Sequence, residues 1–384
     1  MSANTKKVIT ILLIVIITAF TACTGNKDNI QDNDQVVETE GNQGENIPPT
    51  DKEPEEIVED EPEPEQEVSQ TLGLDELKDL KVNELGKIMV IMYHGIGENE
   101  EEWVRTPENF RKDLKTLYDN GYRAIGMKDY IEGNIDTPPG TTPVILTFDD
   151  GLQNQFNILD DGGDFEVDPD SAVGILEEFN EQYPDFGLKA TFYVFYPVPF
   201  RQEELIAKKF EYLVEKGMEI GNHAYTHENL RADMNTKEPR DAQFVQEALG
   251  KNVQLTQEIL PGYEVDSLAL PYGAAPQDED VFNYVVKGSF EGTEYHHKVV
   301  LLVGSNPARS PYHIETNMAR LPRVRGSEMN TEGTGIYDWL DYFDKNPEER
   351  FISDGDPNTI SFPKELEEYM DPERAGGRTI QAYE

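Results

Sequence analysis

The feature that most constrains the fold of this chain is an apolar run, Val144–Phe148, which ends in two adjacent carboxylates, Asp149 and Asp150, and then Gly151. A near-continuous apolar run of this length is typical of a strand covered on both faces, as in a parallel sheet flanked by helices. Successive strand residues point to opposite sides, so two consecutive Asp side chains can converge on one site only where the strand ends. The run therefore predicts an α/β fold with a carboxylate pair at one strand end.

Two histidines, His223 and His227, follow later in the segment His-Ala-Tyr-Thr-His. Because they are four residues apart, they would share one face of the chain if the backbone were helical. One Asp and two His are enough to hold a divalent metal ion with a position left open for water. The second Asp would then be free to act as a base on that water, so these residues predict metal-assisted hydrolysis.

Strand and helix patterns alternate through the remainder of the chain. The first strand is expected at Lys87–Tyr93, and Thr106 and Pro107 offer an N-cap and a first helical position for a helix that Gly121 ends. Further strands are expected at Ala190–Phe195, Met218–Gly221, Leu268–Leu270, Val299–Val303 and Leu321–Val324. Further helices are expected at Arg201–Lys216, Arg240–Lys251 and Asp278–Lys287. This alternation leaves a barrel or an open doubly wound sheet.

Several short motifs stand in a characteristic order along residues 86–326. They are Thr-Phe-Asp-Asp-Gly at 147–151, His-Ala-Tyr-Thr-His at 223–227 and Leu-Pro-Tyr-Gly at 270–273, with supporting segments at Ile88–Gly97 and Lys189–Phe195. Together they are similar to the motifs of the polysaccharide deacetylase family, of the NodB-homology or carbohydrate esterase type. The resemblance implies a distorted (β/α) barrel of about seven strands, in which the strand ends that carry the motifs meet at one rim.

The resemblance also implies roles for the motif residues. Asp149 would be the general base, and Asp150, His223 and His227 would bind one divalent metal ion, for which zinc suits two imidazoles and a carboxylate. A main-chain N–H at Tyr272 would help to hold the oxyanion of the reaction. Substrate-binding positions are expected at Pro271, beside this tyrosine, and at His94, which directly follows the first strand.

Two positions depart from the family pattern. Ala269 stands where the family often has an arginine that orients the base, and we expect Arg323 to supply that guanidinium and to contact Asp149. The family usually has a late histidine that protonates the leaving amine, but no histidine follows His313 in this sequence. His94 would be able to reach the rim, yet the sequence leaves the general acid unassigned.

The N-terminus resembles a bacterial lipoprotein signal over residues 1–23. Lys6 and Lys7 precede an apolar stretch, Val8–Phe20, that suits an export signal better than a spanning helix, and Cys23 would be the lipidated residue. An uncleaved N-terminal anchor is the alternative. Either reading places the catalytic part outside the cytoplasm, attached to the cell membrane.

Residues 24–70 form an acidic linker rich in Asp, Glu and Pro, which has too little apolar surface to fold. The formal net charge of −43 opposes binding of nucleic acid. Within the catalytic part, we expect a solvated Gly- and Asp-rich loop at Leu152–Ser171. A C-terminal extension, residues 327–384, would pack on or near the barrel, and its Trp339 would either pack there or stack on a sugar.

Three functions follow from this reading. The first is a metal-dependent N-deacetylase that acts as a monomer on peptidoglycan or an exopolysaccharide with N-acetylglucosamine-type units. The second is an O-deacetylase or esterase on acetylated glycans, which needs less help with its leaving group. The third is a catalytically weak carbohydrate-binding protein, which the missing histidine and Ala269 would explain.

Overall fold

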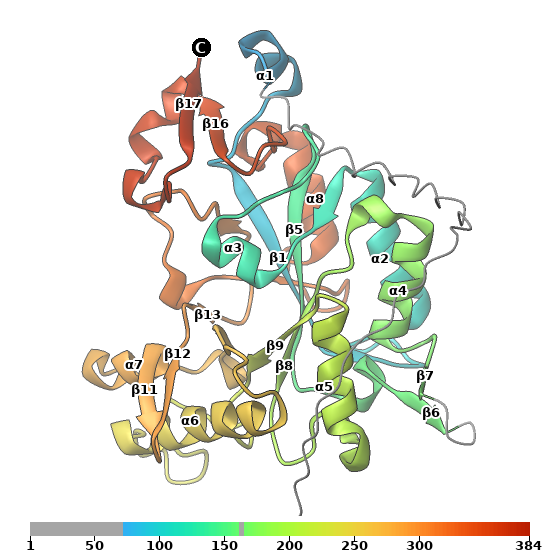
Figure 1. Cartoon of the computed structure of the whole chain (residues 1–384), viewed down its shortest axis with the longest axis vertical. Coiled ribbons are helices and arrows are strands. Elements are labelled where there is room, and N and C mark those ends of the chain that lie inside the picture. The colour runs from blue at the N-terminus through green and yellow to red at the C-terminus, as the bar shows by residue number, and fades with distance from the viewer. Residues whose placement is uncertain (1–71, 161–164) are drawn as a thin grey trace, which may run out of the picture. The chain divides into compact units, whose positions relative to one another are not determined.

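The computed structural model describes residues 72–160 and 165–384 (Figure 1). The expected signal segment with Cys23 and the acidic linker lie outside these residues. Within the part that is described, no helix is both long enough and apolar enough to cross a membrane.

The fold is built on one sheet of nine strands, whose main path has the order β13-β10-β9-β8-β5-β1-β14. In that order the strands are Val299–Leu301, Ser267–Ala269, Glu219–Asn222, Thr191–Val194, Thr142–Phe148, Lys87–Tyr93 and Ala308–Arg309. Two further strands join off this path, β4 (Tyr122–Ala124) beside β5 and β15 (Val324–Arg325) beside β1. All pairs are parallel except that of β1 with β14.

The chain around β15 bridges β13, at one end of the sheet's main path, and β1, the strand next to the other end. Leu321 forms a parallel bridge to Leu301 of β13, and Val324 pairs with Ile91 of β1. The sheet is therefore a distorted half barrel with seven strands along its main path, which confirms the fold expected from the sequence.

Both faces of the central strands are buried, as the apolar runs predict. In β1, Met89 and Ile91 join one hydrophobic cluster, whereas Ile88 and Val90 join a second cluster on the opposite face. This is the period of two expected for a strand that is covered on both sides.

The helices flank the sheet. They are α1 (Leu74–Leu80), α2 (Pro107–Asp119), α3 (Met127–Glu132), α4 (Ala172–Gln182), α5 (Ile206–Glu215), α6 (Ala242–Ile259), α7 (Glu279–Val286) and α8 (Ile336–Lys345). The Thr106 hydroxyl caps α2 by accepting a bond from the Asn109 N–H at 3.2 Å, as the sequence predicts. In Figure 1, α2 packs against α4 on one flank, and α5 packs against β9.

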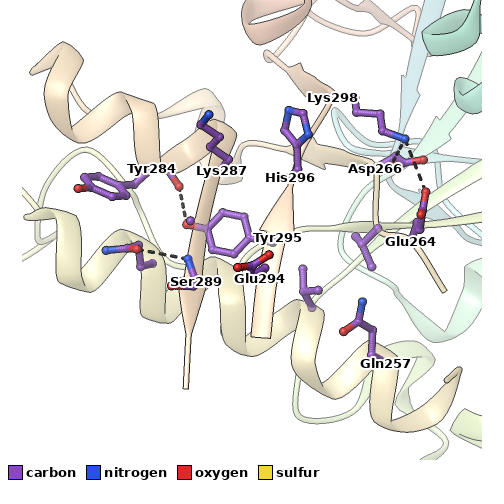
Figure 2. A pocket seen from close by; sticks show the side chains of 14 residues that line it. Gln257, Glu264, Asp266, Tyr284, Lys287, Ser289, Glu294, Tyr295, His296 and Lys298 are labelled. Carbon is purple, nitrogen blue, oxygen red and sulfur yellow. Dashed lines mark hydrogen bonds and ion pairs between the residues drawn. The ribbon is translucent and has the colours of Figure 1, made fainter. Parts of the chain in front are cut away.

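Helices α6 and α7 and the hairpin of β11 (Lys287–Phe290) and β12 (Thr293–His296) border a cavity of about 790 Å³ (Figure 2). Asp266 and Lys298, which form an ion pair of 2.9 Å, lie in its wall. They precede β10 and β13, so this cavity opens near the starts of these strands, away from the strand ends that carry the motifs.

The segment after Asp150 differs from expectation. Instead of a solvated loop, it contains a short hairpin of β6 (Ile158–Asp160) and β7 (Phe165–Val167), and Phe156 is fully buried in the main core. Its Gly- and Asp-rich composition concealed the apolar residues that fix this segment to the domain.

The C-terminal residues 327–384 pack on the same core. Leu340 and Phe343 of α8 belong to the first hydrophobic cluster, and β16 (Thr359–Pro363) pairs with β17 (Thr379–Tyr383). Trp339 packs partly buried against the first cluster and donates from its indole to the Ser305 carbonyl at 3.2 Å, so it serves packing.

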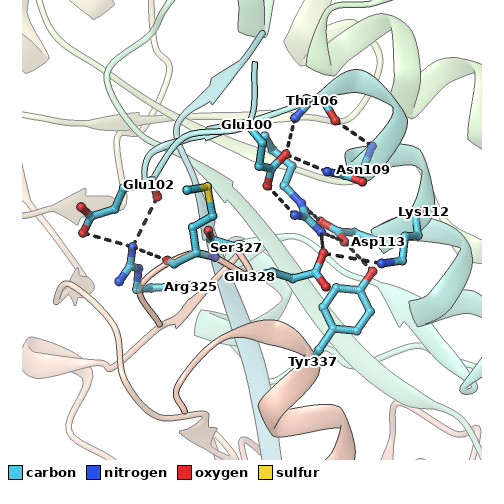
Figure 3. Close-up of polar contacts among 12 residues, drawn as sticks. Glu100, Glu102, Thr106, Asn109, Lys112, Asp113, Arg325, Ser327, Glu328 and Tyr337 are labelled. Carbon is cyan, nitrogen blue, oxygen red and sulfur yellow. Dashed lines mark hydrogen bonds and ion pairs between the residues drawn. The ribbon is translucent and has the colours of Figure 1, made fainter. Parts of the chain in front are cut away.

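A buried polar network also joins this C-terminal part to the barrel (Figure 3). The guanidinium of Arg105, on β3 (Val104–Arg105), donates to both oxygens of Asp113 at 2.8 and 2.6 Å. The hydroxyl of Tyr337, on α8, donates to the same carboxylate at 2.8 Å. Because Asp113 is fully buried, these donors are what compensate its charge.

Candidate active site

The two aspartates lie at the carboxyl end of β5. Asp149 is 2 % exposed, whereas Asp150 is more open. Asp150 and Gly151 have positive φ angles of 79° and 52°, so the backbone turns sharply where the strand stops. This turn lets two consecutive side chains serve one site, which a continuing strand would forbid.

Asp150, His223 and His227 are brought together. The Oδ1 atom of Asp150 lies 3.3 Å from Nε2 of His223 and 3.3 Å from Nε2 of His227. One ligand atom from each residue lies within 4.8 Å of the other two. Among residues 72–160 and 165–384 this is the group of His and acidic side chains that could hold a metal ion.

The histidines converge without a helix between them. His223 follows β9 directly, and the residues from His223 to His227 form a loop in which Ala224 and His227 have positive φ angles of 57° and 59°. The backbone between the two histidines is therefore not helical, but it still brings the two imidazoles to one place. Two residues with left-handed backbone angles, Ala224 and His227, take the place of a helical turn.

The donor set fits a divalent ion such as zinc. Nδ1 of His223 bonds the Ala269 carbonyl at 2.7 Å, which leaves its Nε2 free to act as a ligand. Burial and the neighbouring His223 lower the pKa of His227 to about 4, which favours the neutral imidazole that a metal needs. Burial acts to lower the pKa of His223, but hydrogen bonding to Asp150 and the charge of Asp149 raise it on balance, as expected where carboxylates favour a cation.

Asp149 forms a bidentate ion pair with Arg323. Two guanidinium nitrogens donate to its two carboxylate oxygens, each at 2.7 Å, and Arg323 is fully buried. The same guanidinium donates to Thr147 Oγ1 at 3.2 Å and to the Leu302 carbonyl at 2.8 Å. Burial alone would raise the pKa of Asp149, but Arg323 lowers it below the usual range of a carboxyl group, so Asp149 is ionised at neutral pH.

The contact expected between Arg323 and Asp149 is thus present, and the sheet explains it. Arg323 lies in the segment that spans β13 and β1, with its side chain directed at the end of β5. The approach is close, because a Cβ added to Gly304 would lie 1.8 Å from the Arg323 carbonyl oxygen.

Tyr272, Pro271 and His94 surround this centre. Tyr272 follows β10 in a left-handed conformation with φ 59° and is 57 % exposed, and its ring lies 4.5 Å from the His227 ring. Pro271 is buried beside it. The His94 ring lies 4.8 Å from that of Trp103, and burial lowers the pKa of His94 although Asp149 and Asp150 oppose this shift.

Two other histidines are held elsewhere. His297 is buried between the Val285 carbonyl, at 2.8 Å, and the Asn222 side chain, at 3.0 Å. His313 bonds the Glu315 N–H at 3.1 Å. Neither contacts the carboxylate pair, so of the four histidines outside the cluster His94 is the one whose charge environment includes Asp149.

Sequence reasoning missed three residues of this site. The amide nitrogen of Gln155 donates to the main-chain carbonyls of His94, at 2.9 Å, and of Asp149, so it ties two strand ends together. Phe195 packs its ring 5.4 Å from that of His227, and Arg201 lies over Phe195. Phe195 directly follows β8, and a position at a strand end could have identified it as a site residue. Nothing in the local sequence marked Gln155 or Arg201.

Comparison with known proteins agrees with this geometry. Residues 136–287 match the model of the family described as polysaccharide deacetylase. No curated protein matches the chain.

Solved structures with a similar arrangement include the Streptococcus pyogenes deacetylase PplD in complex with acetate, at 18% identity over 66% of this chain and 97% of that one, with a TM-score of 0.48. The putative polysaccharide deacetylase BA0330 from Bacillus anthracis is 19% identical over 66% of this chain and 68% of its own, with a TM-score of 0.45. IcaB from Ammonifex degensii is 17% identical over 64% of this chain and 94% of its own, with a TM-score of 0.44.

Proposed function

We propose that this protein is a metal-dependent hydrolase that removes N-acetyl groups from N-acetylglucosamine-type units of a cell-surface or extracellular polysaccharide. One observation carries the proposal. A cluster of one carboxylate and two imidazoles lies beside a second carboxylate that a buried arginine keeps ionised. That pairing separates metal binding from base catalysis, as metal-assisted hydrolysis requires.

Asp150, His223 and His227 would hold the ion. When bound, a divalent ion such as zinc lowers the pKa of water to about 7 and polarises a carbonyl oxygen. Asp149 would accept a proton from the attacking water, because its ionised carboxylate has lone pairs and a fixed orientation.

The reaction would proceed by addition and cleavage. The water oxygen would bond to the acetamide carbonyl carbon, the C–N bond would break, and the amine would take up a proton, which yields acetate and a free amino sugar. A main-chain N–H at Tyr272 would donate to the oxyanion. The ring of Tyr272, 4.5 Å from that of His227, and the nearness of His94 to the charges of Asp149 and Asp150 support substrate contacts by these two residues.

An O-deacetylase is the second candidate, and a specific observation favours it. Among the described residues, His297 and His313 bond elsewhere, and His296 lines the cavity beside β11 and β12. No late histidine in this part of the chain therefore stands ready at the carboxylate pair to protonate a leaving group. An alkoxide leaves an ester more readily than an amide ion leaves an amide, so an ester would tolerate this lack.

The location rests on the sequence. The lipoprotein-like segment ending at Cys23 supports attachment to the outer side of the cell membrane, and the acidic linker supports a domain held away from it. Peptidoglycan or an exopolysaccharide would then be within reach of a protein that acts as a monomer.

Metal-reconstituted protein should be given an N-acetylglucosamine oligomer and an O-acetylated xylan oligomer in parallel. Faster acetate release from the first supports the proposal. Faster release from the second supports the esterase. A protein that binds either oligomer and releases no acetate would instead be a binding protein.

A further inference from the structure

Arg201 is an exposed cation beside the candidate metal cluster. It follows β8 within a turn that also carries Phe200, and both residues have left-handed backbones, with φ angles of 56° and 58°. Residues other than glycine rarely adopt this backbone conformation, so the surrounding structure must impose it. Two contacts of Phe200 impose this conformation: its side chain is fully buried, and its main-chain N–H donates to the Gly151 carbonyl at 2.7 Å.

This anchoring ties the Arg201 turn to the turn after the carboxylate pair. The Arg201 guanidinium lies over the Phe195 ring, 4.7 Å from its centroid, and that ring lies 5.4 Å from His227. One guanidinium nitrogen lies 3.5 Å from the main-chain oxygen of Asp150. One aromatic ring therefore separates a fixed positive charge from a metal ligand.

The guanidinium keeps donors to spare. Its polar partners in the described chain are two main-chain carbonyls, of Val198 at 2.9 Å and of Asp150 at 3.5 Å. No carboxylate among the described residues lies within ion-pair distance of it, although the chain has 76 acidic and 33 basic residues. By contrast, Arg325 also lies over an aromatic ring, that of Trp103, but it pairs with Glu102 at 3.4 Å.

We propose that Arg201 binds a carboxylate of the substrate, on a sugar unit next to the acetylated one, and so selects an acidic polysaccharide. A guanidinium with free donors in a planar fork matches a carboxylate through two hydrogen bonds. The chain's net charge of −43 would otherwise repel an acidic polymer, and a local cation at the rim offsets this repulsion where the polymer must bind.

This inference rests on the proposed function and narrows it. Two kinds of polymer offer the required carboxylate. In one, N-acetylglucosamine alternates with a lactyl-ether sugar whose carboxyl is free, as in peptidoglycan strands from which the stem peptides have been removed. In the other, it alternates with a uronic acid. A neutral N-acetylglucosamine polymer offers none and would be the poorer substrate.

The test compares kcat/KM for acetate release on matched oligomers. The lactyl-ether oligomer and the uronate oligomer are each used with free and with amidated carboxyl groups. In Arg201→Met, the ratio of kcat/KM on free over amidated oligomer should fall about tenfold, mainly through KM, as expected for a lost charge-assisted contact. Arg201→Lys should retain part of the wild-type preference for the free over the amidated oligomer. The oligomer for which this preference falls in Arg201→Met, lactyl-ether or uronate, identifies the sugar that carries the carboxylate.

Arg378→Met is the matched control, because Arg378 also donates to main-chain carbonyls but lies in the C-terminal part. Its ratio should equal that of the wild type. Metal content is measured in each variant, since Arg201 contacts the carbonyl of a metal ligand. Equal losses on free and amidated oligomers, or an unchanged ratio in Arg201→Met, would overturn the inference.

Failure of the proposed function is recognisable separately. If the wild type releases acetate from no oligomer, the proposed function is wrong. Calorimetric binding of the same oligomers then tests whether Arg201 binds a carboxylate. Tighter binding of the free acids in the wild type, lost in Arg201→Met, would still support the carboxylate site. Equal affinities for free and amidated oligomers would reject it.

Discussion

Replacing Arg323 by methionine tests how the candidate base is held. The wild-type guanidinium makes two bonds of 2.7 Å to Asp149 and one of 2.8 Å to the Leu302 carbonyl, and it is fully buried. Methionine fills much of the same space but leaves a buried carboxylate without a partner. Breaking such a pair costs about 3–5 kcal/mol, a large part of the roughly 5–15 kcal/mol that stabilises a typical domain.

The pH dependence gives a second readout of the same change. Burial acts to raise the pKa of Asp149, and Arg323 more than offsets this in the wild type. Without the guanidinium the pKa rises, so Arg323→Met should lose acetate release at acidic pH and regain it as the pH increases. The stability of the two proteins should converge at acidic pH. In the wild type, the depressed pKa of Asp149 stabilises the fold above the unfolded value of about 3.9, and this contribution is lost as the pH falls below that value. In Arg323→Met, the unpaired carboxylate is relieved as it protonates through its raised pKa, so the stability deficit should shrink as the pH falls through that raised pKa and on below about 3.9.

Denaturant unfolding and pH–rate profiles measure these two effects. Arg320→Met is the control, because Arg320 makes an exposed ion pair of 3.0 Å with Glu279, worth about 0–1 kcal/mol. In an Asp149→Asn background, Arg323→Met should cost much less, since no charge is left unpaired. The reasoning is refuted if Arg323→Met destabilises no more than Arg320→Met and leaves the pH–rate profile unmoved.

Four further predictions follow from the same structure. Asp149→Asn should abolish turnover and keep the bound metal, as measured by elemental analysis; loss of metal would merge the two carboxylate roles. Burial lowers the pKa of Lys209 to about 7, below the unfolded value of about 10.4, so stability should rise with pH across that window, and Lys209→Met should flatten the rise in melting temperature. Gly304→Ala should lower both stability and turnover, because the added methyl group would displace the chain at Arg323; wild-type turnover would contradict this. Deleting residues 26–70 should barely change the melting temperature, because their composition offers little apolar surface to a core, and a large drop would argue that they pack on the domain.

Hydrophobic pattern predicted the sheet well. The first strand has the predicted bounds, Lys87–Tyr93, and Val144–Phe148 lies within β5, because both are apolar on both faces and their strand ends are marked by polar residues. Strand ends of a curled parallel sheet meet at one rim, so the order of motifs also indicated which side chains would meet.

Turns with left-handed residues are where the sequence was insufficient. Nothing in His-Ala-Tyr-Thr-His shows that Ala224 and His227 adopt positive φ angles, so the motif predicted that the histidines would meet but not how the backbone brings them together. The turn that presents Arg201 is equally hidden, because it is imposed by the burial of Phe200 and by a bond to Gly151, which lies far away in the sequence. Such conformations depend on tertiary contacts and not on local preference.

Metal titration of the wild-type protein tests the central claim most directly. Metal-free protein is titrated with zinc while acetate and free amine released from an N-acetylglucosamine oligomer are both measured. The account predicts no release without metal, a rise that saturates at one zinc per chain, and equal amounts of acetate and amine. Full release from metal-free protein, or a rise that persists in a His227→Ala variant with no metal bound, would contradict it.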